Sequence, residues 1–293
     1  MIYLLLSIAM SSLIQVIFKY YSKYRIDNYQ AIPFNYLVCV IMGMILAPDT
    51  VSGISEGVSQ GATWVIHSLL LGILFILILI GMARCAQEIS ISVSTVAAKM
   101  GVALPVLYGF FFLKEASNAG LVTGIVLSFT SIFLVARLHP EHHLKGTLAA
   151  FLPVAVFAGS GVIDLNLKIM QIRYLADIET HWIVTTIFGG AFISGTMLIF
   201  WRMHRHKQRL ERENVLAGIL LGIPNYFSIY FLVMALNQPG YDTVFVMPLN
   251  NIGIVLLSVL LSIWLFSEKL TPRLKLGILT SLVSIILIGI WGN

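Results

Sequence analysis

Ten long apolar segments, separated by short polar stretches, constrain this chain more than any other feature of its sequence. They cover residues 2–18, 29–47, 63–83, 89–113, 119–136, 147–163, 182–201, 215–236, 244–266 and 274–291. A helix of roughly 20 apolar residues crosses the hydrocarbon core of a bilayer. With 58% hydrophobic and only 11% charged residues, the chain has the composition of a membrane protein. The sequence therefore predicts an all-α integral membrane protein with ten transmembrane helices.

A stretch of 45 residues occurs twice in the chain. Residues 93–137 align without a gap on residues 246–290 at a shift of 153 positions, and 13 of the 45 pairs are identical. The matches of Gly124 with Gly277 and of Glu115 with Glu268 carry most weight, because apolar matches are common in so hydrophobic a chain. Such a repeat indicates a duplicated unit. We expect a first five-helix copy over residues 1–137, a linker over 138–146 and a second copy over 147–293.

Five spans per copy predict that the two copies cross the membrane with opposite polarity, which is the inverted-repeat plan of many secondary transporters. The loops after odd-numbered spans, with the adjoining helix ends, hold 14 Lys and Arg residues, whereas the loops after even-numbered spans hold three. Basic residues accumulate in cytoplasmic loops. We therefore expect the odd-numbered loops in the cytoplasm, both termini outside, and a bacterial inner membrane as the location.

The formal charge of +5 comes mainly from these loops, so insertion polarity explains it better than a nucleic-acid partner. The densest run, residues 202–213, is interpreted as a solvated loop that fixes topology, with binding of anionic headgroups as the alternative. His139, His142 and His143 are interpreted as part of a polar linker rather than a metal site. Cys39 and Cys85 have neither disulfide nor metal spacing. We expect no metal and no cofactor, and the oligomeric state, with a monomer as one option, is left open.

Polar side chains inside the spans are the candidate binding residues, because a charge in hydrocarbon needs a partner or water. Lys99 lies about ten residues into the fourth span. It could hold an anionic substrate or alternate between protonated and neutral forms. The alternative is a lysine that reaches the interface or pairs internally. No acidic partner at its own depth is evident from the sequence.

The first and sixth spans correspond at a shift of 149 positions, which places Gln15 on Asp164 and Lys19 on Lys168. Asp164 and Lys168 are four residues apart and share a helix face, so they could neutralise each other. We interpret Lys19 and Lys168 as structural. Gln15 and Asp164 are candidates for substrate binding because an inverted repeat would bring both to the interface of the copies.

Amide side chains near prolines form a second set of candidates. Asn250 and Asn251 follow Pro248 in the ninth span, two and one positions before the counterpart of Lys99. Similar pairings of a proline with a nearby amide occur in the second and eighth spans, where the candidates are Asn35, Asn225 and Tyr226. Interhelical hydrogen bonding, worth about 1 kcal/mol, and substrate contact are both open for these residues.

Glu115 and Glu268 each precede a helix that begins with a capping sequence, Ser117-Asn118 or Thr271-Pro272. A carboxylate there is favoured by the helix dipole. We prefer this structural role over proton transport, and we treat Gly124 and Gly277 as structural as well.

With its ten spans, its duplicated unit and its Leu-Lys-Glu and Phe-Ser-Glu joints, the chain resembles an EamA-type member of the drug/metabolite transporter superfamily. The resemblance is strongest at residues 105–124 and 258–277, where the usual Gly-Glu of the family is Lys114-Glu115 and Ser267-Glu268. The first span departs from the family's usual Trp-Gly-Ser, with Ser11-Ser12 in its place. Related four-helix exporters use a glutamate in their first helix, where this chain has Gln15. The resemblance implies export but disfavours that mechanism of drug export.

These observations predict a carrier, not an enzyme, that moves a small polar metabolite such as an amino acid or other carboxylate by alternating access. The two five-helix halves would rock about a midplane cavity lined by the first, third, fourth, sixth, eighth and ninth spans. Proton coupling is left open. The rival hypothesis is an intramembrane lipid-modifying enzyme, which would need a converging acid/base or nucleophile cluster. No such cluster is evident in the sequence.

Overall fold

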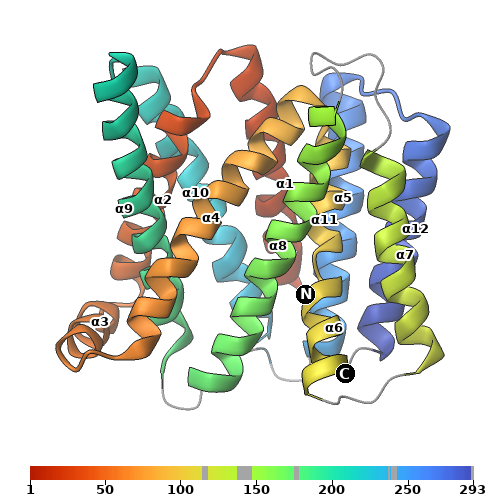
Figure 1. The fold of residues 1–293 in the computed structure, drawn as a ribbon, viewed down its shortest axis with the longest axis horizontal. Coiled ribbons are helices and arrows are strands. Elements are labelled where there is room, and N and C mark those ends of the chain that lie inside the picture. The colour runs from red at the N-terminus through yellow and green to blue at the C-terminus, as the bar shows by residue number, and fades with distance from the viewer. Residues whose placement is uncertain (114–117, 137–146, 175–177, 237, 239–242, 292–293) are drawn as a thin grey trace. The chain divides into compact units, whose positions relative to one another are not determined.

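The computed structural model describes residues 1–113, 118–136, 147–174, 178–236, 238 and 243–291, and these residues form helices and short connections without a strand. The helices are α1 (Ile2–Lys23), α2 (Asn28–Leu46), α3 (Asp49–Ser59), α4 (Thr63–Glu88), α5 (Ile91–Met100), α6 (Ala103–Phe112), α7 (Ala119–Ala136), α8 (Thr147–Tyr174), α9 (Thr180–His206), α10 (Arg212–Leu236), α11 (Thr243–Phe266) and α12 (Pro272–Trp291) (Figure 1). Ten helical segments are long and apolar enough to cross a membrane. The predicted all-α class is confirmed, and the ten segments indicate a multi-pass integral membrane protein.

The fourth span differs from a single continuous helix. It consists of α5 and α6, separated by a turn at Gly101 and Val102. Pro105 has no N–H, so it cannot donate the usual bond to the carbonyl of Gly101, which accepts instead from Leu104 N at 2.9 Å. Ser258 occupies the matching position in the second copy, and α11 is continuous there.

A short helix, α3, replaces the loop expected between the second and third spans. Its buried side consists of Thr50, Gly53 and Gly57. A methyl group on Gly53 would lie 2.3 Å from the indole ring of Trp182, so α3 packs against the start of α9 at very close range.

By packing, the chain divides into two compact units. Unit 1 contains Met1–Tyr20, Gly81–Leu165 and Phe227–Asn293, and unit 2 contains Tyr21–Ile80 and Asn166–Tyr226. Unit 1 therefore takes most of its residues from the first, fourth and fifth spans of each sequence copy and unit 2 from the second and third, with α4, α8 and α10 each divided between the two units. The division by packing does not follow the division of the sequence at residues 138–146.

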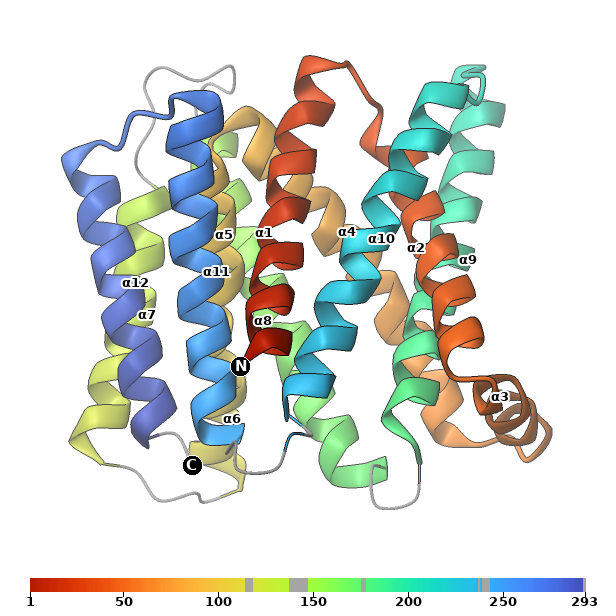
Figure 2. The ribbon, with the colours of Figure 1, turned by 180° about the vertical axis from the view of Figure 1, so that it is seen from behind.

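Helices α7 and α12 lie side by side in unit 1 (Figures 1 and 2) and run antiparallel, since Gly120 approaches Trp291 while Gly277 approaches Val135. Two hydrogen bonds join them. Ser131 Oγ donates to Gly277 O at 2.8 Å, and Ser284 Oγ donates to Gly124 O at 2.7 Å. Ser284 and Gly124 are the counterparts of Ser131 and Gly277 at a shift of 153 positions. The two bonds are therefore equivalent in the two sequence copies. Gly124 and Gly277 thus lie where the two backbones meet.

Helices α2 and α9 form the matching pair in unit 2. A methyl group on Gly43 would meet Thr185, near the start of α9, whereas the carboxylate of Asp27, just before α2, pairs with Arg202 near the end of α9. The two helices are therefore antiparallel. As a result, residues 49–61 and residues 202–213 lie at opposite ends of α9.

Candidate binding site in the membrane spans

Five predicted binding residues belong to unit 1, and three belong to unit 2. Unit 1 contains Gln15, Lys99, Asp164, Asn250 and Asn251. Unit 2 contains Asn35, Asn225 and Tyr226.

Lys99 and Asp164 are the two charged residues among the candidates in unit 1. Lys99 lies in the last turn of α5, just before the Gly101 turn, and that turn touches α8: a methyl group on Gly101 would lie 2.6 Å from Gly161 N. Asp164 follows one turn later on α8. The two half-buried side chains interact electrostatically. Between these two described residues there is neither a hydrogen bond nor a direct ion pair.

No acidic partner of Lys99 at its own depth is evident from the sequence, whereas the structure gives Lys99 an electrostatic interaction with Asp164. Its partner, Asp164, is supplied by a helix of the other sequence copy, so no local pattern could reveal it. The same finding changes the interpretation of Asp164. The sequence suggested neutralisation by Lys168 on the same helix, whereas the structure gives Asp164 an electrostatic interaction with Lys99. Lys168 is half-buried on α8.

Gln15 and Asn250 are buried amides, each with 3% of its surface exposed. Gln15 Oε1 and Asn250 Oδ1 find no hydrogen-bond donor in the described part of the chain. An unpaired buried acceptor costs about 1–3 kcal/mol, so each oxygen favours a guest that can donate a hydrogen bond. Asn251 is half-buried beside Asn250.

The two amides lie at different depths. Helices α1 and α11 run parallel, since Gly253 approaches Ile8 and Tyr20 stacks edge-on against Phe266 at 5.1 Å between ring centroids. In this register Gln15 lies level with a position on α11 that is roughly ten residues beyond Asn250. At about 1.5 Å per residue, the two amides are separated by about 15 Å along the helix axes. The polar groups of unit 1 are therefore spread along the spans instead of forming one layer.

The candidates in unit 2 hold helices together. Asn225 Nδ2 on α10 donates to Asn35 Oδ1 on α2 at 3.0 Å, and both residues are buried. Of the two roles left open for these amides, the geometry fits interhelical hydrogen bonding. Asn35 Nδ2 has no acceptor among the described residues. Tyr226 is half-buried on α10.

The residues interpreted as structural occupy helix ends and helix contacts. Lys19 Nζ donates to the carbonyls of Ala86 at 3.0 Å and Gln87 at 3.3 Å, in the last turn of α4. Such donation satisfies carbonyls that have no partner inside the helix. Glu268 interacts electrostatically with Lys19, and its carboxylate oxygens accept no hydrogen bond within the described chain.

The predicted cap Thr271 is confirmed, whereas at the first joint the capping residue is Asn118, one position after the expected Ser117. Asn118 Oδ1 accepts from Leu121 N at 2.9 Å at the start of α7, and Thr271 Oγ1 accepts from Leu274 N at 3.3 Å at the start of α12. Glu115 lies outside the described residues, as do His139, His142 and His143. The dipole role of Glu115 and Glu268 stays a prediction.

The fold defined by this arrangement is found in other proteins. No family model matches the chain. A solved crystal structure covers 98% of this chain and 94% of its own at a TM-score of 0.58 and 14% identity, which shows a shared fold. A protein of Haemophilus influenzae, described as uncharacterized, is 25% identical over 288 residues, covering 96% of this chain and 95% of that protein.

Proposed function

We propose that this protein is a secondary transporter, an exporter of a small polar metabolite such as an amino acid or other carboxylate. The observation that carries the proposal is the pair Lys99 and Asp164, which are opposite charges within candidate membrane spans that interact without a direct ion pair. Charges at such depth are costly and mark substrate or ion pathways. A zwitterionic amino acid offers a carboxylate to Lys99 and an ammonium group to Asp164.

We propose that the two sequence copies form an inverted repeat, which supports transport by alternating access, with proton coupling as an open feature. The reciprocal bonds of Ser131 and Ser284 relate α7 to α12 as an antiparallel duplication would. A further correspondence joins Ser12, whose Oγ lies 3.5 Å from Ile254 O, to its counterpart Gly161, which approaches Gly101 O. Inverted repeats of this kind are typical of secondary carriers. We assign the protein to the bacterial inner membrane and to the EamA-type transporters on the same basis.

Flux through proteoliposomes tests the proposed function. Vesicles containing the purified protein are loaded with labelled amino acids and other carboxylates, and efflux is followed with and without a proton gradient. Lys99→Ala and Asp164→Asn are each expected to lower flux of the transported compound at least tenfold. Lys269→Ala, at an exposed site outside the spans, is the matched control. Unchanged flux in both site variants would exclude the site. A modified lipid as reaction product would favour an enzyme instead.

A further inference from the structure

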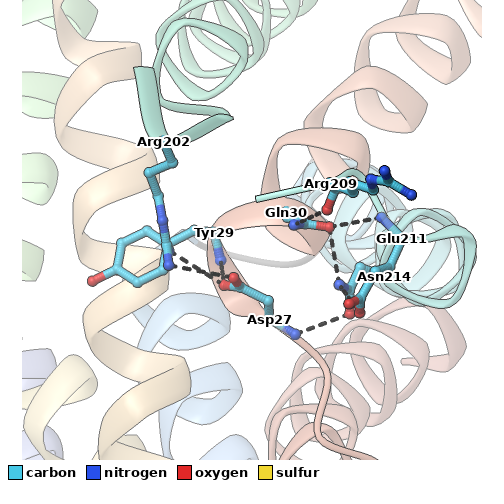
Figure 3. A network of polar contacts seen from close by, with 7 residues as sticks. All are labelled: Asp27, Tyr29, Gln30, Arg202, Arg209, Glu211 and Asn214. Atoms are coloured by element: carbon cyan, nitrogen blue, oxygen red, sulfur yellow. Dashed lines mark hydrogen bonds and ion pairs between the residues drawn. The ribbon is translucent and has the colours of Figure 1, made fainter. Parts of the chain in front are cut away.

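Two loops at one end of unit 2 are joined by a network of polar contacts (Figure 3). One is the connection from α1 to α2, and the other is the connection from α9 to α10. Asp27 N donates to Asn214 Oδ1 at 2.9 Å, and Gln30 Oε1 accepts from Asn214 Nδ2 and from Glu211 N at 3.0 Å each. Gln30 Nε2 donates to Arg209 O at 3.0 Å. These contacts join residues about 180 positions apart in the chain, so no local pattern in the sequence predicts the junction.

The acidic and amide side chains of the junction are engaged within it. Both carboxylate oxygens of Asp27 lie 3.5 Å from the guanidinium of Arg202, which also lies over the ring of Tyr29 at 4.2 Å. Glu211 Oε2 accepts from Asn214 Nδ2 at 3.1 Å. Among the described Lys and Arg residues of the run 202–213, Arg202 is the one whose charge is neutralised by a carboxylate of the junction, that of Asp27.

The other Lys and Arg side chains of the connection 24–27 and of the run 202–213 are exposed. They are Arg25, Arg205, Lys207, Arg209 and Arg212, which we call the basic collar. Figure 3 shows the side chain of Arg209 extending away from the network while its carbonyl is held by Gln30. Arg25 and Lys207 adopt left-handed backbone conformations, with φ of 55° and 52°, in the turns that carry the collar.

Large aromatic side chains lie beside the basic collar. Tyr24 is 66% exposed, and Phe200 and Trp201, at the end of α9, are 65% and 54% exposed. Exposed aromatic rings at span ends are typical of the level of lipid headgroups. The basic collar and these three aromatic side chains lie at, or within a few residues of, the ends of candidate membrane spans, where contact with lipid headgroups is expected.

We propose that the basic collar binds the headgroups of anionic phospholipids. Each basic residue near an anionic surface contributes about 1 kcal/mol, which is about a fivefold change in affinity. The polar network holds the two loops together, so residues contributed by distant parts of the sequence form one surface. If the basic collar served only to fix the orientation of the protein in the membrane, it would need positive charge. The folded protein would then show no preference for one lipid headgroup over another.

Lipid titration of the purified full-length protein, followed by native mass spectrometry, tests the collar. Phosphatidylglycerol is compared with phosphatidylcholine for the wild type and for Arg205→Gln/Lys207→Gln/Arg209→Gln. Lys269→Gln/Arg273→Gln/Lys275→Gln is the matched control, because it removes three exposed basic residues from the joint between α11 and α12. The wild type is expected to prefer phosphatidylglycerol at least tenfold. The collar variant should lose about 100-fold in low salt, and the control less than threefold.

Salt, a soluble anion and a second variant complete the test. Raising the salt concentration should weaken binding of phosphatidylglycerol, because exposed charges are screened. Free glycerol phosphate at the same concentration should not displace the lipid. Equal losses in the collar and control variants, equal binding of both lipids, or displacement by glycerol phosphate would overturn the proposal. If the triple variant melts early, Arg25→Gln/Arg212→Gln is used, and unchanged binding there would overturn it as well.

Discussion

Among the residues that the structure describes, three other than glycine have a left-handed backbone. Arg25, Lys207 and Ser267 have φ between 52° and 55°, a conformation that costs an L-residue with a Cβ about 1–2 kcal/mol. Ser267 occupies this position directly after α11, where its N–H donates to Ile263 O at 3.0 Å. This is the left-handed cap that often ends a helix with glycine.

Ser267→Gly is therefore expected to stabilise the protein. Glycine removes the steric cost of the left-handed turn but gives the unfolded chain more freedom, so the net gain is about 0.5–1 kcal/mol. The measurement is the melting temperature of the purified protein in detergent. Gly61→Ala is the reverse control, because Gly61 has φ of 62° and no atom near an added Cβ. A lower melting temperature for Ser267→Gly would contradict the interpretation.

At the scale of helices, close approach decides which spans become neighbours. A methyl group on Gly190 of α9 would lie 2.5 Å from Leu69 O of α4, whereas a methyl group on the adjacent Gly189 would meet nothing within 4 Å. Small residues at helix contacts let backbones approach closely, and packing of this kind is a principal source of helix association in lipid. The two adjacent glycines thus have different roles on one helix.

Substitution of Gly190 should destabilise the protein, whereas substitution of Gly189 should not. Gly190→Ala forces α4 and α9 apart and is expected to cost about 1–3 kcal/mol. Gly189→Ala adds no clash and should be neutral or stabilising by up to about 1 kcal/mol, because alanine favours helix. Thermal unfolding of both variants in the same detergent gives the comparison. Equal destabilisation by the two alanines would show that the α4–α9 contact is not the cause.

Helix α3 is attached to α9 by a titratable contact. Asp49 Oδ2 accepts from His181 Nε2 at 2.9 Å and from Trp182 Nε1 at 3.0 Å. Both bonds lower the pKa of Asp49 from its usual value of 3.8, and the bond from His181 has the larger effect. The carboxylate of Asp49 has a lower pKa when α3 is docked on α9 than when it is free. Its stabilisation of the docked helix is therefore complete above pH 3.8 and is lost as the pH falls through the lower pKa of the docked state.

We expect α3 to stay docked at pH 5 and to loosen only below pH 3.8. A fluorophore on Ser55→Cys, at an exposed position of α3, reports the change as a loss of anisotropy. The native cysteines, Cys39 and Cys85, are buried and should not react. Asp49→Asn should loosen α3 at every pH and remove the acid transition. A transition that persists in this variant would assign it to another group.

At the scale of the whole molecule, the loops 49–61 and 202–213 differ both in charge and in position. Residues 49–61 contain no Lys or Arg, whereas residues 202–213 contain five, and the antiparallel pair α2 and α9 places them at opposite ends. The charge difference and the packing are independent observations that support the same orientation.

Cysteine labelling in intact cells tests this orientation. In a background without Cys39 and Cys85, Ser55→Cys should react with a membrane-impermeant maleimide from outside, and His204→Cys should react only after the membrane is permeabilised. Both positions are exposed, so access to the reagent is limited by the membrane alone. Labelling of both positions from the same side would contradict the opposite polarity of the two sequence copies.

Ten spans, the caps at Asn118 and Thr271, and the correspondence of Gly124 with Gly277 follow from local pattern, because segment length, apolar composition and capping chemistry act within one helix. The pairing of Lys99 with Asp164, the bond between Asn35 and Asn225, and the junction around Asp27 depend on which distant helices become neighbours. Close backbone approach at glycines selects these neighbours, and the mixing of spans from both copies in each unit is its result. Such contacts join residues far apart in the chain, so the tertiary structure alone decided them.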